Sequence, residues 1–284
     1  MRSTDGHETN RHYIILTMVW CLLLCSRIDA QHLSIVTRLS GAINGQAFSM
    51  MLDTLERESR DSLIQLEILK GNMPSFIRML VPVTVQRQLR GRSHTATFFA
   101  APDYCMVGSD DDFFYTPLSP RTAQCIADSL GCCLPTTAMV DAIYNAARMK
   151  LTPAPIAPST AMTTVPVFRQ HNTFIRAQRD SQSAVYPKGS LTAGHKKDVV
   201  ISNKCPQGKV AIYGWHRPDG TPIQPLYTGH TEKWVDYSHG IRFISKTMIV
   251  DGLEITVARV LADSLLCELI SAEGVIPHPR YGER

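Results

Sequence analysis

The chain has 284 residues, of which 44% are apolar and 19% are charged, and its formal net charge is +4. This composition is ordinary for a globular protein, and the length suits one large domain or two small ones. Because the net charge is small and no basic stripe with interleaved aromatic residues occurs, nucleic acid is not expected as a partner.

The N-terminus has the pattern of a cleavable secretory signal peptide. Arg11 and His12 precede an almost unbroken apolar run, residues 13–25, and the small residue Ala30 closes the segment. The run is shorter than the roughly 20 residues that span a bilayer. We therefore expect residues 1–30 to be a signal peptide, a secreted or periplasmic location, and no stable membrane insertion after cleavage. An uncleaved anchor or a buried N-terminal strand is the alternative.

The first half of the remaining chain is predicted to be rich in helices. Apolar residues recur at three- and four-residue steps over residues 43–70, which indicates one or two helices. Residues 75–86 favour a short helix followed by a strand, and residues 94–101 favour a second strand, so a hairpin is expected. Two further helices are expected at residues 119–130, with Ser119 as the N-cap and Pro120 at the first helical position, and at residues 136–150.

The second half is predicted to be rich in strands. Residues 151–166 are rich in Pro, Ala and Thr, which is typical of a linker or a surface loop, and a short helix at 171–179 follows. The expected strands lie at residues 199–202, 209–215, 221–227, 238–245 and 246–252, and a final amphipathic helix at 256–271.

This order of elements predicts an α+β fold, in which a helical N-terminal half packs on a mostly antiparallel C-terminal sheet. The expected parts are a helix-rich part with a hairpin at residues 31–150, the linker or surface loop at 151–166, and a strand-rich part at 167–284. We expect the helix-rich and strand-rich parts to form one domain.

Six cysteines remain after the signal peptide, and disulfides are their leading explanation because an exported protein meets an oxidising compartment. Sequence alone cannot choose among the 15 possible pairings. There is no CxxC pair and no Cys/His spacing typical of structural zinc, so no metal site is predicted. These cysteines are Cys105, Cys125, Cys132, Cys133, Cys205 and Cys267.

Histidines gather in the second half, and the densest polar stretch is residues 228–243. Its Ser238-His239-Gly240 and Arg242 resemble part of the signature of the L,D-transpeptidases, cell-wall enzymes with a His-Gly pair followed by Ser-His-Gly-Cys-x-Arg. Ile241 stands where the nucleophilic cysteine of that family belongs, and the arginine comes one residue early, so the thiol mechanism of that family cannot operate here. The resemblance covers about sixteen residues.

A second resemblance, to papain-like hydrolases that include bacterial cell-wall amidases and endopeptidases, rests on the order of elements. In that family a cysteine lies at a helix N-terminus and a histidine follows on a later strand. Cys132 and Cys133 precede the expected 136–150 helix, and His239 or His195 follows. A helix N-terminus and an imidazolium lower the pKa of a thiol, and Asp236 would orient the imidazole, with Asp198 as the other possibility. The structural alternative is that both cysteines are paired in disulfides.

The candidate substrate-binding residues are polar or aromatic. Lys196, with its neighbours His195 and Lys197 at an expected strand start, and Arg242 would meet anionic groups such as carboxylates. Trp215, with Tyr227 and Trp234, would offer faces on which sugar rings stack, although these rings would serve equally well in the core. The complete expected set is His195, Lys196, His216, His230, Arg242 and Trp215.

Three consecutive carboxylates, Asp110 to Asp112, lie in an expected loop. Oxygen ligands of this kind suit calcium or magnesium, but the spacing differs from the EF-hand pattern. A different possibility is that they act as acid and base groups of a glycosidase, with Glu232 or Asp236 as the partner carboxylate.

Two functional hypotheses follow. The first is a secreted hydrolase or transferase that acts, without a cofactor, on a cell-envelope polymer such as peptidoglycan, a saccharide or peptide substrate. In it His239 is the general base, Asp236 orients the imidazole, and Cys132 or Cys133 is the nucleophile. The second is a non-catalytic secreted domain that binds a saccharide or a protein.

Overall fold

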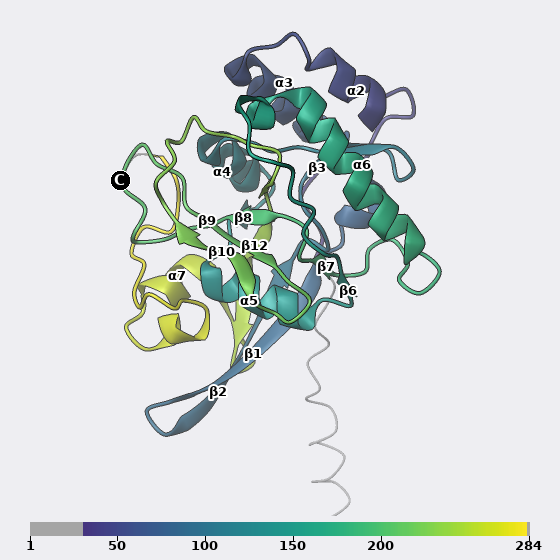
Figure 1. Ribbon diagram of the computed structural model, residues 1–284. Helices are drawn as coiled ribbons and strands as arrows, with labels where there is room; N and C mark the ends of the chain where they lie inside the picture. Colours follow the sequence, from purple (N-terminus) through teal and green to yellow (C-terminus); the bar gives the residue numbers. More distant parts are fainter. Residues whose placement is uncertain (1–30, 283–284) are drawn as a thin grey trace, which may run out of the picture.

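The computed structural model describes residues 31–282, and helices occur between groups of strands along them (Figure 1). The α-helices are α2 (Gly45–Met51), α3 (Arg57–Leu69), α4 (Pro120–Ser129), α5 (Thr137–Ala146), α6 (Val165–Ser181) and α7 (Val257–Ala262). The strands are β1 (Val81–Leu89), β2 (Arg92–Ala100), β3 (Met106–Gly108), β4 (Phe113–Tyr115), β5 (Cys132–Cys133), β6 (Met149–Lys150), β7 (Thr192–Ala193), β8 (Lys197–Val199), β9 (Ile212–His216), β10 (Pro222–Tyr227), β11 (His239–Gly240), β12 (Ile244–Val250) and β13 (Leu253–Thr256).

Two sheets organise the described residues. The larger sheet has the order β1-β2-β12-β13, with β5 also paired to β12, and all of its pairs are antiparallel. The smaller sheet has the order β10-β9-β8-β11, and its β8–β11 pair is parallel. The short pairs β3–β4 and β6–β7 complete the strand pairing.

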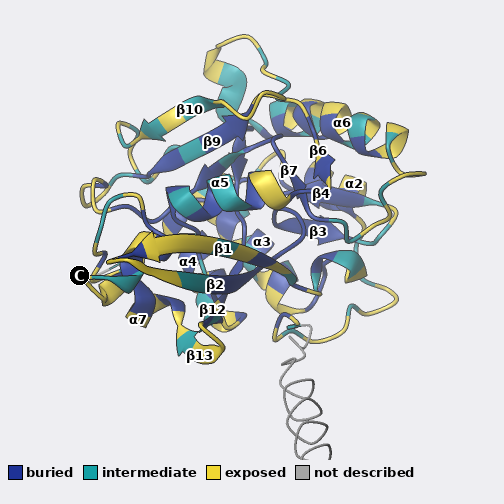
Figure 2. Ribbon diagram, turned by 90° about the horizontal axis from the view of Figure 1, so that it is seen from below, coloured by how far each residue is buried: buried dark blue, intermediate teal, exposed yellow. Residues whose placement is uncertain are grey.

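Helix α5 lies between the two sheets, with β9 and β10 on one side and β1 on the other (Figure 2). Its buried residues include Met139, Val140, Ile143 and Tyr144, at the three- and four-residue steps of an amphipathic helix. One contiguous apolar cluster joins this helix to both sheets and to α3, α4 and α6. The core therefore runs through the whole described chain.

The predicted arrangement of a helical N-terminal half packed on a C-terminal sheet is wrong. The helices are scattered between strands along the chain, and the larger sheet takes β1 and β2 from the N-terminal half. Strand β2 lies between β1 and β12, so its apolar residues need partners that are far away in sequence. Local periodicity identified the elements, but it carries no information on which distant strands pair.

Several local predictions are confirmed. The expected hairpin is present as β1 and β2, which pair antiparallel from Val81–Ala100 to Leu89–Arg92. Helix α4 begins after Ser119, whose side chain accepts a hydrogen bond from the backbone N–H of Thr122.

Two predicted helices have different bounds in the structure. Helix α6 begins inside the expected linker and is longer than predicted, because residues from Val165 onward already bury apolar side chains. The expected C-terminal helix is shorter, since α7 ends at Ala262 and only a 3₁₀ turn follows at Leu266–Leu269.

The expected signal peptide lies outside the described residues. Among residues 31–282, no helix is both long enough and apolar enough to cross a membrane. The expected disulfides do not form within this part of the chain, where Cys105, Cys125, Cys132, Cys133 and Cys267 are all thiols.

The pairing of β2 with both of its neighbours generates a stability prediction. Phe98 is fully buried in β2, opposite Val83 on β1 and Met248 on β12. Phe98→Ala should lower the free energy of unfolding by about 3–5 kcal/mol, because it leaves a cavity between three strands. Urea denaturation measures the change. The matched control Leu253→Ala, at a side chain that is 74% exposed, should change it by less than about 0.5 kcal/mol. Equal effects of the two substitutions would contradict this pairing.

Candidate functional site

A buried carboxylate, Asp103, joins several segments that are far apart in the chain. Its Oδ2 accepts hydrogen bonds from the Tyr115 hydroxyl, at 2.8 Å, and from the Arg179 guanidinium on α6. Its Oδ1 lies 3.2 Å from Nε2 of His195, which directly precedes Lys196 and β8. Burial alone would raise the pKa of Asp103, but Arg179 and His195 oppose it and hold this pKa below its usual range. Asp103 is therefore a buried anion with protein partners on both oxygens.

A second buried ion pair, Asp198 with Arg242, lies next to this carboxylate. The guanidinium of Arg242 donates to the carbonyl oxygens of Ala101 and Thr192, both at 2.8 Å, and its Nε lies 3.7 Å from Asp198 Oδ1. Asp198 Oδ2 accepts from the Tyr104 hydroxyl at 2.7 Å. Burial raises the pKa of Asp198 to about 6, although Arg242 opposes the shift. The guanidinium of Arg242 is thus engaged by backbone carbonyl groups, and we do not propose it as a substrate-binding residue.

The predicted base His239 and the predicted orienting residue Asp236 do lie together. Strand β11 pairs parallel with β8 and puts His239 opposite Lys197. Nε2 of His239 is 3.8 Å from Asp236 Oδ2. Asp236 Oδ1 accepts hydrogen bonds from both the N–H and the hydroxyl of Ser238, and Oδ2 accepts from Trp234 Nε1 at 3.2 Å. Both side chains are almost fully buried.

The two groups of this pair have complementary protonation states at neutral pH. Burial lowers the pKa of His239 to about 4 despite the opposing effect of Asp236, so the imidazole is neutral at neutral pH. Burial would raise the pKa of Asp236, but His239 and the hydrogen bonds from Ser238 outweigh it, and Asp236 stays ionised. A neutral imidazole can accept a proton, and a neighbouring carboxylate stabilises the imidazolium that results.

Lys196, a predicted substrate-binding residue, reaches the same region. Its ammonium donates to the carbonyl oxygen of Tyr237 at 2.6 Å and lies 5.7 Å from the centre of the Tyr115 ring. Burial lowers the pKa of Lys196 to about 7, against the opposing effect of Asp236 and Asp103. At neutral pH this amine therefore exists in both protonation states.

Trp234 connects the buried pair to an open groove. The groove has a volume of about 500 Å³, and Trp234 lines it together with Asp53, residues 55–58, Arg60, residues 163–166, Lys233 and Val235. The indole Nε1 of Trp234 donates a hydrogen bond to Asp236 Oδ2. His230 stacks on Trp234 with ring centres 4.9 Å apart, and Tyr227 meets His230 edge-on at 5.0 Å. A row of three aromatic rings thus ends at Trp234, which both lines the groove and hydrogen-bonds to Asp236.

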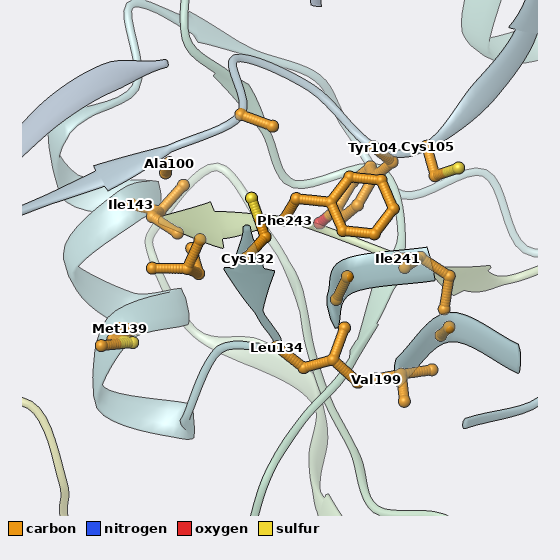
Figure 3. Packing of buried hydrophobic residues seen from close by; sticks show 14 of the residues in the cluster. Ala100, Tyr104, Cys105, Cys132, Leu134, Met139, Ile143, Val199, Ile241 and Phe243 are labelled. Atoms are coloured by element: carbon orange, nitrogen blue, oxygen red, sulfur yellow. The ribbon is translucent and has the colours of Figure 1, made fainter. Parts of the chain in front are cut away.

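The structure gives the two candidate nucleophiles a different setting from the predicted one. Cys132 and Cys133 form β5, which pairs with β12, while Thr136 is the residue that caps helix α5. Cys132 lies among buried apolar side chains that include Phe243 and Leu134 (Figure 3). Burial raises the pKa of both thiols, that of Cys133 to about 12. A thiolate is therefore disfavoured at both positions, and we leave both out of the proposed site.

The other predicted residues divide between core and surface. Trp215 is buried, so it does not share a stacking platform with Tyr227 and Trp234. His216, at the end of β9, lies 3.0 Å from Asp141 Oδ1 of α5 and stacks on Tyr144. His195 is held between Asp103 and the rings of Tyr104 and Tyr115, where burial lowers its pKa.

The carboxylates of the 110–112 loop are engaged by protein groups. Asp110 accepts from Ser75, Asp111 pairs with Lys188, and Asp112 accepts from the N–H of Gln46. Among residues 31–282, no group of three or more His, Cys, Asp or Glu side chains is arranged to hold a metal ion.

Sequence reasoning missed His171 as a member of the site, and it did not place Lys197 beside His239. His171 lies on the buried face of α6, between Phe168 and Ile175, and its ring centre is 4.9 Å from that of Tyr237. The sequence feature that could have indicated His171 is the presence of a histidine on the otherwise apolar face of a helix. Lys197 lies opposite His239 only because β8 and β11 pair in parallel, which no local pattern indicates.

Comparisons of the chain with protein-family models, with curated proteins and with solved structures find no match.

The buried imidazole of His239 makes stability depend on pH. Its folded pKa of about 4 lies below the ordinary 6.5, so the unfolded chain binds a proton there that the folded chain does not. Stability should therefore fall as pH drops from 6.5 to 4, and His239 should account for about 3 kcal/mol of that fall. His239→Gln should reduce the fall by this amount in urea denaturation series. The exposed control His278→Gln should leave it unchanged, and identical pH profiles for wild type and His239→Gln would refute the prediction.

Proposed function

We propose that this chain is a secreted or periplasmic hydrolase or transferase that acts on a cell-envelope polymer such as peptidoglycan, with His239 as the general base. The observation that carries the proposal is the position of Asp236. Its carboxylate lies beside the neutral imidazole of His239 and also accepts a hydrogen bond from Trp234, which lines an open groove. A groove of about 500 Å³ that Trp234 connects to a buried acid–base pair suits an extended substrate.

The chemistry proposed for the pair needs no thiol. His239 takes a proton from water, or from an acceptor hydroxyl or amine in a transfer reaction, as this nucleophile attacks the scissile bond. Asp236 stabilises the imidazolium, which then returns the proton to the leaving group. The sum of the hydrolytic reaction is addition of one water across one amide or glycosidic bond, and no oxidant, reductant or cofactor takes part.

A second candidate function, saccharide binding without catalysis, is favoured by one observation. The rings of Tyr227, His230 and Trp234 form a row that ends at the groove. Aromatic faces of this kind pack on the apolar faces of sugar rings. In this alternative the row holds the polymer, and the buried His239 has a structural role.

Turnover of purified peptidoglycan separates the two candidates. The mature chain, which is the chain expected after removal of residues 1–30, should release soluble fragments from peptidoglycan. His239→Gln should reduce the rate of this release by about 10²- to 10⁴-fold, the usual contribution of a general base. His278→Gln is the matched control at an exposed histidine and should keep the wild-type rate. Thermal melts establish that both variants are folded.

Sedimentation with insoluble peptidoglycan completes this test. Co-sedimentation of the wild-type chain without fragment release, with loss of binding in Trp234→Ala, would replace the catalytic proposal by the binding one. Equal fragment release by wild type and His239→Gln would remove His239 from the mechanism.

A further inference from the structure

A set of nitrogen donors, buried except for the half-buried Lys197, lies beside the His239–Asp236 pair and takes no part in the proposed proton transfer. Trp215 comes from β9, His171 from α6, Lys197 from the first position of β8, and Lys196 from the residue before it. The ring centres of His171 and Trp215 are 6.4 Å apart, and both rings contact Tyr237, at 4.9 and 6.3 Å. The ammonium of Lys197 lies 5.1 Å from the centre of the Trp215 ring. We call His171, Lys196, Lys197 and Trp215 the donor cluster.

Several nitrogens in and beside the donor cluster have no hydrogen-bond partner among the described residues. They are Nε1 of Trp215 and both ring nitrogens of His171 and of His239. All three side chains are at most 4% exposed. A buried polar group without a partner costs about 1–3 kcal/mol, so several at one place call for a specific explanation.

The backbone at Trp215 is also unusual. Its φ is +56°, a conformation that bulky side chains rarely adopt and that costs about 1–3 kcal/mol. The ring is nevertheless held between His171, Tyr237 and Lys197, with its N–H in the same buried region. Backbone strain of this kind concentrates at ligand-binding positions.

The charge balance of the region indicates what would fill it. When Lys196 is protonated, the cations in the connected network exceed the carboxylates by one, and the histidines of the network are held neutral by burial. The cations are Lys196, Lys197, Arg179 and Arg242, and the carboxylates are Asp103, Asp198 and Asp236. The indole N–H and the ammonium groups only donate hydrogen bonds. A ligand group that only accepts hydrogen bonds and carries one negative charge would pair with these donors and would also neutralise the excess positive charge.

We propose that the donor cluster binds a carboxylate of the substrate, held between Trp215 Nε1 and the ammonium groups of Lys196 and Lys197, next to His239. This inference rests on the proposed function, because it names the chemical group by which the polymer is held at the site. A carboxylate fits better than a phosphate dianion, because the excess is a single positive charge. Carboxylates of peptide termini and of acidic sugars share this chemistry.

Isothermal titration calorimetry of the mature chain tests the inference without reference to turnover. The probes are N-acetylalanine, which carries a free carboxylate, its amide, which does not, galacturonic acid as the sugar-borne carboxylate, and inorganic phosphate. N-acetylalanine, galacturonic acid or both should bind at least tenfold more tightly than the amide and than phosphate. The preferred carboxylate tells a peptide terminus from an acidic sugar. Binding at pH 8 should take up a proton, because the anion restores the charge of Lys196, whose pKa is lowered to about 7 by burial.

Two variants locate the binding site. Trp215→Phe removes the N–H and keeps most of the ring, and Lys197→Met removes one ammonium group, and each should weaken binding of the preferred carboxylate by tenfold or more. Lys204→Met, at an exposed lysine, is the matched control and should bind as the wild type does. Unfolding curves verify that the variants are folded.

The outcomes separate this inference from the proposed function. Carboxylate-selective binding that depends on Trp215 and Lys197 supports the inference even if peptidoglycan is not turned over. Turnover that depends on His239, together with equal affinity for N-acetylalanine and its amide and no binding of galacturonic acid, overturns the inference and leaves the proposed function standing. Carboxylate binding that neither substitution weakens places the anion elsewhere and also overturns it.

Discussion

The interaction on which much of this structure depends is the buried contact of Asp103 with Arg179, Tyr115 and His195. The four residues come from the segment after β2, from α6, from β4 and from the turn before β8. A buried ion pair is costly to desolvate, and breaking one by removing a partner typically costs 3–5 kcal/mol. Such a contact contributes less to net stability than to the choice of one arrangement, because an arrangement that separates these charges in the core would leave them unpaired.

The candidate site is built directly on this contact. His195 is followed at once by Lys196 and Lys197, so fixing His195 against Asp103 also fixes the start of β8. Strand β8 then pairs with β11 and sets His239 beside Lys197, and it pairs with β9, which carries Trp215. The ion pair of Asp198 with Arg242 ties β8 to the segment between β11 and β12. Rigid placement of this kind is what proton transfer requires, because a small displacement of the groups lowers the rate steeply.

The two thiols and the three acidic loop residues illustrate how tertiary packing reassigns residues that a sequence marks as reactive. Cys132 and Cys133 precede a helix in the sequence, but their pairing with β12 places them in a strand and in apolar surroundings. A thiol there stays protonated, since burial disfavours the charged form. Asp110, Asp111 and Asp112 form a cluster in the sequence but bind Ser75, Lys188 and Gln46 separately. In both cases the partner that decides the chemistry comes from a distant segment.

The sequence by itself determined the local elements and the polar stretch that contains the site. Periodicity and capping residues were sufficient for α4 and for the β1–β2 hairpin, because these depend on neighbours within a few residues. The pairing of His239 with Asp236 was also accessible, since only two residues lie between them in one turn. Only the tertiary structure decided the mixed strand order, the role of Arg242, and the approach of His171, Lys197 and Trp215 to His239. The reason is that these features are set by pairing and charge neutralisation between segments far apart in the chain, and a local pattern does not specify its distant partner.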